Sequence, residues 1–502
     1  MKKYFVLFLS LGLLLAGCSN DDNGKVPGPG GPNPDPSADV VVQDFMWKAM
    51  NLWYFWQGDV DDLADDRFTS DAEYTEFLES ESNPEDFFFN KLLFTEDRFS
   101  FLSDDYVELT QNLSGISRSN GLEFGLTYFD DNGNDMLDTN EEIFGYVRYI
   151  VNNSDASTKD ISRGDLFTGV DGQTLMGGNY VNLLFGENDT YTLNMAEIAG
   201  DSVNPNGGEV TLTKQENLVE DPVFIVKSFE VSGQKIGYFM YNGFTNEFDT
   251  ELNEAFGQLK SDGVTDLILD LRYNPGGSVN SARLLSSMIY GPNTEDLFIR
   301  QRWNDKIQAS FDDSDLEDYF ADKLGNGAAI NSLNLSRVYV LTTGSTASAS
   351  ELVINGLDPY IDVITIGTAT TGKNEFSLTM VDDPDREGAP FIYTPSRKDQ
   401  INPDNSWAIQ PLVGRNENSA GFSDYTNGLA PDIVLEEDLE NLGVLGDENE
   451  PLLARAIQEI TGVSAKMDFS VQMPVKLHSS SKMFQPIKDN MILDKPLHLP
   501  NF

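Results

Sequence analysis

Two short segments near the middle of the sequence hold residue types that can act together as a nucleophile and its base. One is Thr346–Glu351, which contains Ser348, and the other is Thr371–Asn374, which contains Lys373. Each segment follows an apolar run that is typical of a buried strand. A serine hydroxyl can attack a carbonyl once a neighbouring group accepts its proton, and a neutral amine can be that group. Ser348 and Lys373 are therefore a candidate catalytic pair.

Histidine and cysteine usage makes lysine the favoured base. The 502-residue sequence has two histidines, His478 and His498, and both lie near its C-terminal end. A serine–histidine–aspartate triad would have to take its histidine from there. The single cysteine is Cys18, so thiol catalysis and cysteine zinc sites have little support. If the chain is a hydrolase, Lys373 is the expected base.

Three predicted strands bring these residues to one edge of a sheet. Apolar strands alternate with amphipathic helices here, which predicts a mostly parallel sheet with crossover helices. In such a sheet the loops after the carboxyl ends of the strands gather on one side. The strands and the residues that follow them are 266–271 before the turn Asn274–Gly277, 338–343 before Ser348, and 363–367 before Lys373.

The same loops offer groups that could stabilise an oxyanion. Ser348 begins a predicted helix, where backbone amides lack helical partners and favour negative charge. The amide of Ala349 is one candidate donor. The turn at Gly276 and Gly277 could bring a second amide close, because neither residue has a side chain. Lys373 must be neutral to act as a base, so it has to be desolvated or placed among positive dipoles.

Each of these residues also has an ordinary structural interpretation. Ser348 alone would be a helix N-cap, Lys373 alone a surface lysine, and Gly276–Gly277 alone a turn. Their joint placement, in a chain without a well-placed histidine, favours the catalytic interpretation.

The motifs resemble those of the carboxy-terminal processing, or tail-specific, serine peptidases. The similarity extends over about residues 113–465, and its motifs are Asp270–Gly277, Thr346–Glu351, Gly372-Lys373 and Thr426–Asp432. The resemblance implies a nucleophile, a general base and two sources of oxyanion donors, which are respectively Ser348, Lys373, the Gly276/Gly277 turn and Ala349.

One position departs from the pattern of that family. Many members carry a glutamine four residues after the lysine, where it orients the amine, and here that position is Ser377. The resemblance therefore implies that Ser377 does this more weakly, that another group does it, or that turnover is low.

The sequence predicts a multidomain protein of the α/β and α+β classes. The helical domain is rich in aromatic residues, which we interpret as core rather than as a ligand surface. The C-terminal tail has no periodicity and could be an ordered strap or a loose end. The predicted units are a signal peptide (1–17), a lipidated tether (18–40), a small N-terminal helical domain (41–112), a β-rich PDZ-like domain (113–215), a mostly parallel-sheet peptidase core (216–465) and the tail (466–502).

Residues 161–173 resemble the PDZ pattern in which a Gly-Asp turn leads into a strand and a tight turn. Gly172 is expected to supply the positive φ of that tight turn. PDZ domains take an extended peptide as an added strand and grip its C-terminal end. The carboxylate-binding loop of that family has no clear counterpart in this sequence.

An acidic insertion in this domain has two interpretations. Position six of a calcium-binding loop, normally glycine, is Asp135 here, and the flanking residues are predicted strands. We therefore prefer an acidic hairpin, and we expect no metal or other cofactor. The residues that match ligand positions one, three, five, nine and twelve of such a loop are Asp130, Asn132, Asn134, Asp138 and Glu141.

The N-terminus is typical of a secreted, lipidated protein. Lys2 and Lys3 precede an apolar run that is too short for an ordinary spanning helix. Leu15–Cys18 resembles a bacterial lipobox, in which the cysteine is lipidated. The acidic residues after Cys18 resemble the surface-export signal of Bacteroidetes lipoproteins. The expected location is thus the bacterial cell envelope, anchored to the outer membrane through Cys18 and either periplasmic or surface-exposed.

Charge narrows the choice of partners. The sequence has 82 acidic and 33 basic residues, a formal net charge of −49. This charge repels phosphates, so neither nucleic acid nor an anionic lipid surface is an expected partner. Solubility is the ordinary explanation of such acidity, and a specific cation-binding role is the alternative.

Two functions fit these observations. The leading hypothesis is a lipid-anchored serine endopeptidase that cleaves extended or unfolded polypeptides, with cleavage near their C-termini as one option. The alternative is a non-catalytic lipoprotein on the same fold that binds a peptide or an apolar ligand. Keeping both Ser348 and Lys373 favours the enzyme, whereas the change at Ser377 favours the binding protein. The natural substrate and the oligomeric state do not follow from this sequence.

Overall fold

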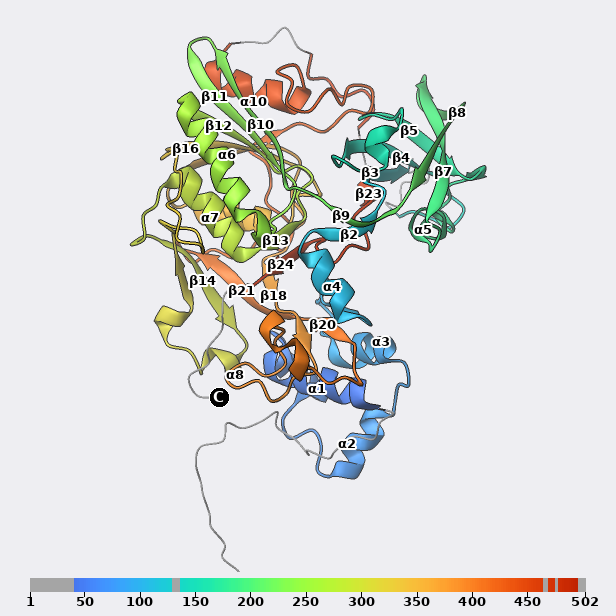
Figure 1. Cartoon of the computed structure of the whole chain (residues 1–502), viewed down its shortest axis with the longest axis vertical. Coiled ribbons are helices and arrows are strands. Elements are labelled where there is room, and N and C mark those ends of the chain that lie inside the picture. Colours follow the sequence, from blue (N-terminus) through green and yellow to red (C-terminus); the bar gives the residue numbers. More distant parts are fainter. Residues whose placement is uncertain (1–39, 129–135, 464–467, 475–476, 495–502) are drawn as a thin grey trace, which may run out of the picture.

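The computed structural model describes residues 40–128, 136–463, 468–474 and 477–494 of the chain. Along the sequence they form an N-terminal helical region, a β-rich region and an α/β core, which Figure 1 shows at the bottom, the right and the upper left. The expected fold class, a multidomain protein with a helical region, β-rich regions and mixed sheets, is confirmed. The domain limits drawn from the sequence stay predictions.

The N-terminal helical region is built around buried aromatic side chains, as expected. Trp47 and Trp53 are buried, and the indole N–H of Trp53 donates to the carbonyl of Pro390 at 2.9 Å. Because Pro390 lies in the core, the region packs against the core. Its helices are α1 (Val41–Trp53), α2 (Asp71–Leu78), α3 (Pro84–Phe87) and α4 (Tyr106–Leu113).

The β-rich region is a twisted antiparallel sheet with one added strand from the far end of the chain. The short helix α5 (Tyr180–Phe185) packs on it. A two-stranded link, β2 (Ile116–Ser119) with β9 (Gln215–Val219), joins it to the rest of the molecule. In spatial order its strands are β23 (Leu477–Ser480), β3 (Leu122–Tyr128), β4 (Ile143–Ile150), β5 (Leu166–Val170), β7 (Thr190–Ala199) and β8 (Ser202–Thr213), with β6 (Gln173–Thr174) paired to β5.

The tight turn between β5 and β6 has the predicted geometry. Gly172 has φ +77° and Asp171 has φ +51°, which are the left-handed values that a two-residue hairpin turn needs. The acidic insertion is described only in part, since Asp130, Asn132 and Asn134 lie outside the described residues. Its interpretation as a calcium loop or an acidic hairpin therefore stays a prediction.

The core sheet is mostly parallel and is covered on both faces. Successive residues of β12 face opposite sides: Leu267 and Leu269 pack with helices α6 (Asp249–Asp262), α7 (Val279–Tyr290) and α9 (Ala349–Leu357), and Ile268 packs with α10 (Pro451–Thr461). Only the β10–β11 pair is antiparallel. In spatial order the strands are β10 (Val223–Val231), β11 (Gln234–Tyr241), β12 (Asp266–Asp270), β16 (Arg337–Thr342), β17 (Asp362–Gly367) and β22 (Ile433–Val434).

A second sheet of the core also takes a strand from the C-terminal segment. A three-stranded sheet lies beside it and consists of β1 (Phe101–Ser103), β20 (Ala408–Gln410) and β19 (Met380–Val381). In spatial order the strands of the second sheet are β13 (Gly276–Ser278), β24 (Asn490–Ile492), β18 (Glu375–Ser377), β21 (Leu412–Asn418), β14 (Leu297–Trp303) and β15 (Glu317–Tyr319). The short helix α8 (Asp305–Gln308) follows strand β14 in the sequence.

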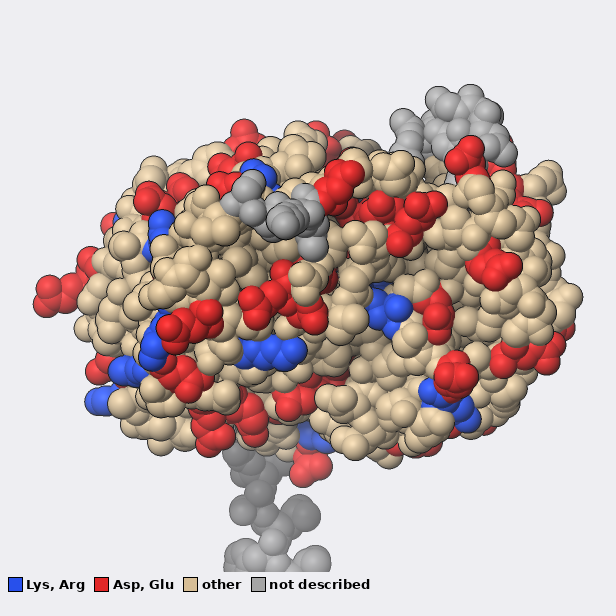
Figure 2. Space-filling model, turned by 90° about the horizontal axis from the view of Figure 1, so that it is seen from above, with Lys and Arg blue, Asp and Glu red and all other residues tan. Residues whose placement is uncertain are grey.

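Acidic side chains are scattered over the face of the molecule that Figure 2 shows, with fewer basic ones between them. In the part of the chain that the structure describes, no three His, Cys, Asp or Glu residues are grouped so as to hold a metal ion. No described helix is long and apolar enough to cross a membrane. The predicted signal peptide and tether lie outside the described residues.

Candidate active site

The three predicted loops meet at one edge of the core sheet. The Gly276 turn follows β12, Ser348 follows β16, and Lys373 follows β17. A Cβ atom on Gly276 would lie 2.7 Å from Ser348 Cβ and 3.1 Å from Ser348 Oγ, closer than side chains can approach. Gly276 also has φ +111°. Only glycine therefore allows the turn to come this close to the serine.

Ser348 stands in a strained turn between a strand and a helix. Its φ of +64° and ψ of −112° are unusual for a residue with a side chain. Such a turn holds a serine hydroxyl away from the backbone around it. Ser348 is fully buried, and its Oγ has no hydrogen-bond partner within the described part of the chain. The hydroxyl is thus not used as an N-cap, although the serine does precede helix α9.

Lys373 is buried rather than exposed. Its side chain is 1% exposed, and Nζ lies 5.1 Å from the centre of the Phe99 ring. Burial lowers the pKa of Lys373 to about 8, against the opposing pull of the acidic Asp489, Glu375 and Asp97. A sizeable fraction of the amine is therefore neutral near pH 8, which is what a base requires.

Glu351 ties the serine loop to the lysine loop. Its carboxylate accepts from the backbone N–H of Ser348 at 2.7 Å, of Gly372 at 2.7 Å and of Lys373 at 2.9 Å, and from the hydroxyl of Thr370. Burial raises the pKa of Glu351 to about 7, and these donors oppose the rise. Sequence reasoning gave Glu351 no role, although its place three residues after Ser348 is the capping-box spacing that could have identified it.

The two glycines of the turn after β12 have different surroundings. The N–H of Gly276 donates to Asn274 Oδ1 at 2.9 Å, and the Asn274 amide donates in turn to the carbonyl of Tyr241 at 2.8 Å. The amide of Gly276 is therefore already used, and this glycine supplies space. The N–H of Gly277, which lies in β13 beside β24, and the N–H of Ala349 at the start of α9 stay the candidate oxyanion donors.

Ser377 lies next to two residues that the sequence did not suggest. Its hydroxyl is 2.5 Å from Asn490 Oδ1 and accepts from Gln410 Nε2 at 3.0 Å. The Lys373 ammonium donates to the same Asn490 Oδ1 at 3.3 Å. A glutamine thus does reach this position, but it comes from β20 rather than from the strand that carries Ser377. No short-range pattern marks Gln410 or Asn490.

The N-terminal helical region holds the lysine loop from outside. Arg98 donates to the carbonyl of Gly372 at 2.5 Å and to that of Thr426 at 2.9 Å. Phe99, the next residue, lies over the Lys373 amine. This region therefore helps to bury the candidate base.

His478, the alternative base that the structure describes, does not have surroundings like those of Lys373. His478 lies on β23, where its ring nitrogen is 3.2 Å from the hydroxyl of Tyr180 and its ring is edge-on to Tyr128. Burial lowers the pKa of His478. His498 lies outside the described residues.

Comparison with known proteins connects this arrangement to one peptidase family. The model for "Peptidase family S41" matches residues 235–410, and that for the "Peptidase S41 N-terminal domain" matches residues 41–101. A crystal structure of the "Putative S41 protease" of Bacteroides fragilis matches with a TM-score of 0.63 at 26% identity, and it covers 87% of this chain and 100% of that one.

Two curated relatives match over part of their length. The "Probable CtpA-like serine protease" of Staphylococcus aureus is 27% identical over 255 residues, which are 49% of this chain and 45% of that protein. The "Carboxyl-terminal-processing protease" of Picosynechococcus is 26% identical over 206 residues, 37% of this chain and 44% of that protein. The chain therefore spans less than half the length of these relatives.

Proposed function

We propose that the chain, whose residues 41–101 and 235–410 match the models of the S41 serine-type peptidases, is an endopeptidase acting on extended or unfolded polypeptides. Ser348 is the nucleophile and Lys373 the general base. The amides of Ala349 and Gly277 stabilise the oxyanion. The observation that carries the proposal is that a buried, unpartnered Ser348 hydroxyl and a buried Lys373 lie on two loops joined by the single carboxylate of Glu351.

The reaction has two halves. Ser348 Oγ attacks the scissile carbonyl carbon while neutral Lys373 Nζ takes the hydroxyl proton, and the carbonyl oxygen becomes an oxyanion. Collapse of this tetrahedral intermediate breaks the C–N bond, and protonated Lys373 gives its proton to the leaving amine. Water then attacks the acyl-serine ester with Lys373 again as the base, which releases the acid and restores Ser348.

The β-rich region is proposed to act as a PDZ-like peptide-binding unit. Its edge strand β3 already pairs with an added strand, β23, next to helix α5. Strand addition beside a helix is the way in which PDZ domains hold an extended peptide. A substrate segment held there would be delivered toward the loops of Ser348 and Lys373.

The location follows from the N-terminal sequence alone. We propose a lipid anchor on Cys18 in the bacterial cell envelope, with residues 19–40 as a tether. The alternative function, a non-catalytic binder on the same fold, is favoured only by the serine at position 377.

A cleavage assay separates the two functions. The purified chain is incubated with a labelled, unfolded protein, in parallel with the variants Ser348→Ala and Ser261→Ala. We expect Ser348→Ala to lose nearly all cleavage, because the attacking oxygen is gone, and Ser261→Ala, at an exposed position of α6, to keep most of it. Equal cleavage by Ser348→Ala would move the nucleophile elsewhere. Binding without cleavage by the parent chain would favour the alternative.

A further inference from the structure

The C-terminal segment 477–494, called the strap below, pairs with two different sheets. Its strand β23 adds antiparallel to β3 of the β-rich region, with Leu477 opposite Thr127 and Ser480 opposite Gly125. Its strand β24 lies between β13 and β18 of the core and is parallel to both. Figure 1 shows these red strands beside their partners. The strap therefore runs from the β-rich region to the catalytic loops.

The first half of the strap is held by specific polar contacts. The N–H of Ser481 donates to the carbonyl of Phe124 at 2.9 Å, and the Ser481 hydroxyl donates to Glu123. The ammonium of Lys482, 7% exposed, is 3.1 Å from Glu220. A partly buried ion pair and a backbone hydrogen bond therefore hold the first half of the strap against the β-rich region.

The second half is inserted into the core. Met491 is fully buried among the apolar side chains of the core, and Asn490 is 1% exposed. The N–H of Leu493 donates to the carbonyl of Ser377 at 3.0 Å. The carboxylate of Asp494 accepts from the hydroxyl of Ser278 at 2.7 Å, at the start of α7.

The strap takes up the place where a substrate would react. The carbonyl oxygen of Asn490 lies 2.5 Å from the point that a Gly276 Cβ would occupy, and Ser348 Oγ lies 3.1 Å from that same point. The Asn490 side chain also binds the Lys373 amine, while Ser348 Oγ has no partner in the described part of the chain. In this arrangement the base is directed at the strap and not at the nucleophile.

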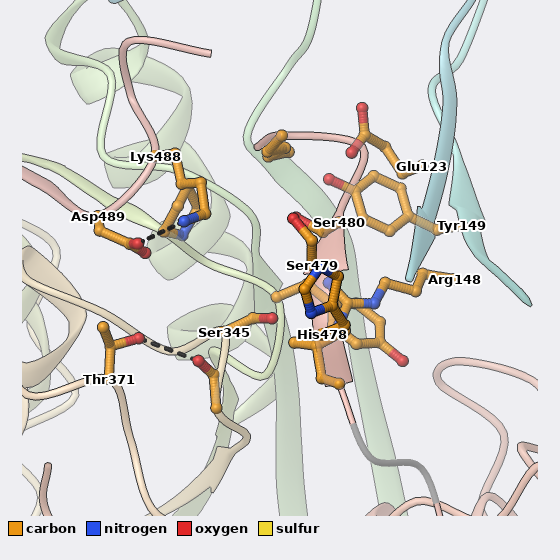
Figure 3. Close-up of a pocket in the computed structure, with 15 residues that line it drawn as sticks. Glu123, Arg148, Tyr149, Ser345, Thr371, His478, Ser479, Ser480, Lys488 and Asp489 are labelled. Atoms are coloured by element: carbon orange, nitrogen blue, oxygen red, sulfur yellow. Dashed lines mark hydrogen bonds and ion pairs between the residues drawn. The ribbon is translucent and has the colours of Figure 1, made fainter. Parts of the chain in front are cut away.

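Cavities on both sides of the strap trace the rest of the path. Figure 3 shows one of about 170 Å³ in which strap residues 478–480 lie between Ser345 and Thr371 of the catalytic loops and Glu123 and Tyr149 of the β-rich region. Further cavities of about 460 and 570 Å³ are lined by strap residues 483–486, 488 and 489, and by 492–494. Together the three cavities follow the strap along most of its length, and they are called the channel below.

We propose that this channel is the binding site for an extended polypeptide substrate and that the strap is its resident, displaceable occupant, with which a substrate must compete, so that cleavage by the parent chain is slowed but not abolished. The proposal that the strap inhibits cleavage rests on the proposed function, whereas the proposal that the strap occupies the channel does not. The ligand that fits is an extended chain that adds a strand at β3 and again between β13 and β18, with an apolar side chain at the place of Met491.

A binding experiment tests occupancy without any catalysis. A fluorescent synthetic peptide with the sequence of residues 477–494 is titrated into full-length Ser348→Ala protein that also carries Met491→Asp or, as the matched control, Met491→Leu. Aspartate cannot be buried at this place without a large cost, so it should release the strap and empty the channel. We expect the peptide to bind the aspartate variant at least tenfold more tightly than the leucine variant, as measured by anisotropy.

Equal binding of the peptide to the two variants, or binding to neither, would show that the strap is not a displaceable occupant of the channel. Circular dichroism checks the fold, and if Met491→Asp fails to fold, Leu493→Pro replaces it, because proline removes the N–H that donates to Ser377.

With Ser348 restored, we expect Met491→Asp to cleave unfolded protein at least fivefold faster than Met491→Leu. Cleavage by Met491→Asp that is equal to or slower than cleavage by Met491→Leu would show that the strap does not inhibit the enzyme. Peptide binding as expected, with no cleavage by any variant, would instead contradict only the proposed peptidase function.

Discussion

Lys373 illustrates how burial alone can give a lysine side chain the pKa that the proposed base needs. No positive group is close enough to be among the main causes that lower its pKa, and the surrounding carboxylates work in the opposite direction. The loss of water around the amine outweighs their attraction and brings the pKa to about 8. The nearby acidic residues therefore limit how far the pKa falls, and the amine keeps enough basicity to remove a serine proton.

The rate should rise with pH through about 8, because only the neutral amine is a base. Lys373→Arg keeps a positive charge but cannot release its proton, so we expect both Lys373→Arg and Lys373→Ala to lose about a hundredfold or more in kcat/KM. The matched control is Lys260→Arg on the exposed face of α6. The measurement is kcat/KM against pH on protein whose fold is checked by circular dichroism. Substantial activity in a folded Lys373→Arg variant would assign the base to another group.

The sequence indicated those site residues that short motifs mark. Ser348, Lys373 and the Gly276 turn each follow a predicted strand, and parallel topology alone places them together. Glu351 has a local signal as well, in its capping-box spacing from Ser348. Asn490 has none, because its place beside Lys373 depends on pairing between strands more than a hundred residues apart.

At the scale of elements, the N-terminal helical region forms one wall of the candidate active site. Arg98 fastens the backbone of the lysine loop at Gly372 to that of a neighbouring segment at Thr426, and Phe99 covers the amine. These contacts cross from one region to another, so the environment of the base depends on how the two regions pack.

Loss of Arg98 should therefore act on the base through solvation. In Arg98→Ala the carbonyls of Gly372 and Thr426 lose their donor, the loop loosens and water reaches the amine, so the pKa of Lys373 moves back toward its ordinary value. We expect the midpoint of the pH–rate profile to shift upward and kcat at pH 8 to fall by about three- to tenfold. Arg67→Ala, a partly exposed arginine of the same region, is the control. An unshifted midpoint with lower activity would mean that Arg98 only stabilises the fold.

Long or strongly patterned elements were predictable, whereas short strands were not. The limits of β12, β16 and β17 agree to within one residue with the predicted strands 266–271, 338–343 and 363–367, because each is marked by an apolar run of its own. The three-residue strands β13, β18 and β24 have no period of their own, and they exist because distant segments pair there. For the same reason the sequence left open whether the tail is a strap.

At the scale of the whole molecule, buried charges join the β-rich region to the core. Arg163 of the β-rich region pairs with Glu437 at 2.8 Å, and Arg272 of the core, fully buried, pairs with Asp270 and Glu450. Burial would raise the pKa of Glu437, but Arg163 and Arg272 outweigh it and lower the pKa to about 2. This carboxylate therefore stays charged at any physiological pH, and the connection between the regions holds there.

The net charge bears on how the molecule is kept at a membrane. A chain with 82 acidic and 33 basic residues is repelled by anionic lipid headgroups, so its folded part is not expected to bind them. An acyl chain on Cys18 would supply the missing attraction, since buried methylene groups contribute about 0.8 kcal/mol each.

We therefore expect Cys18→Ser to move the protein from the membrane fraction to the soluble fraction of the cell envelope. Ser19→Ala, one residue further on, should stay with the membranes. Both variants are compared by fractionation and by incorporation of a labelled fatty acid, and a Cys18→Ser protein that still fractionates with membranes would show that the attachment lies elsewhere in the chain.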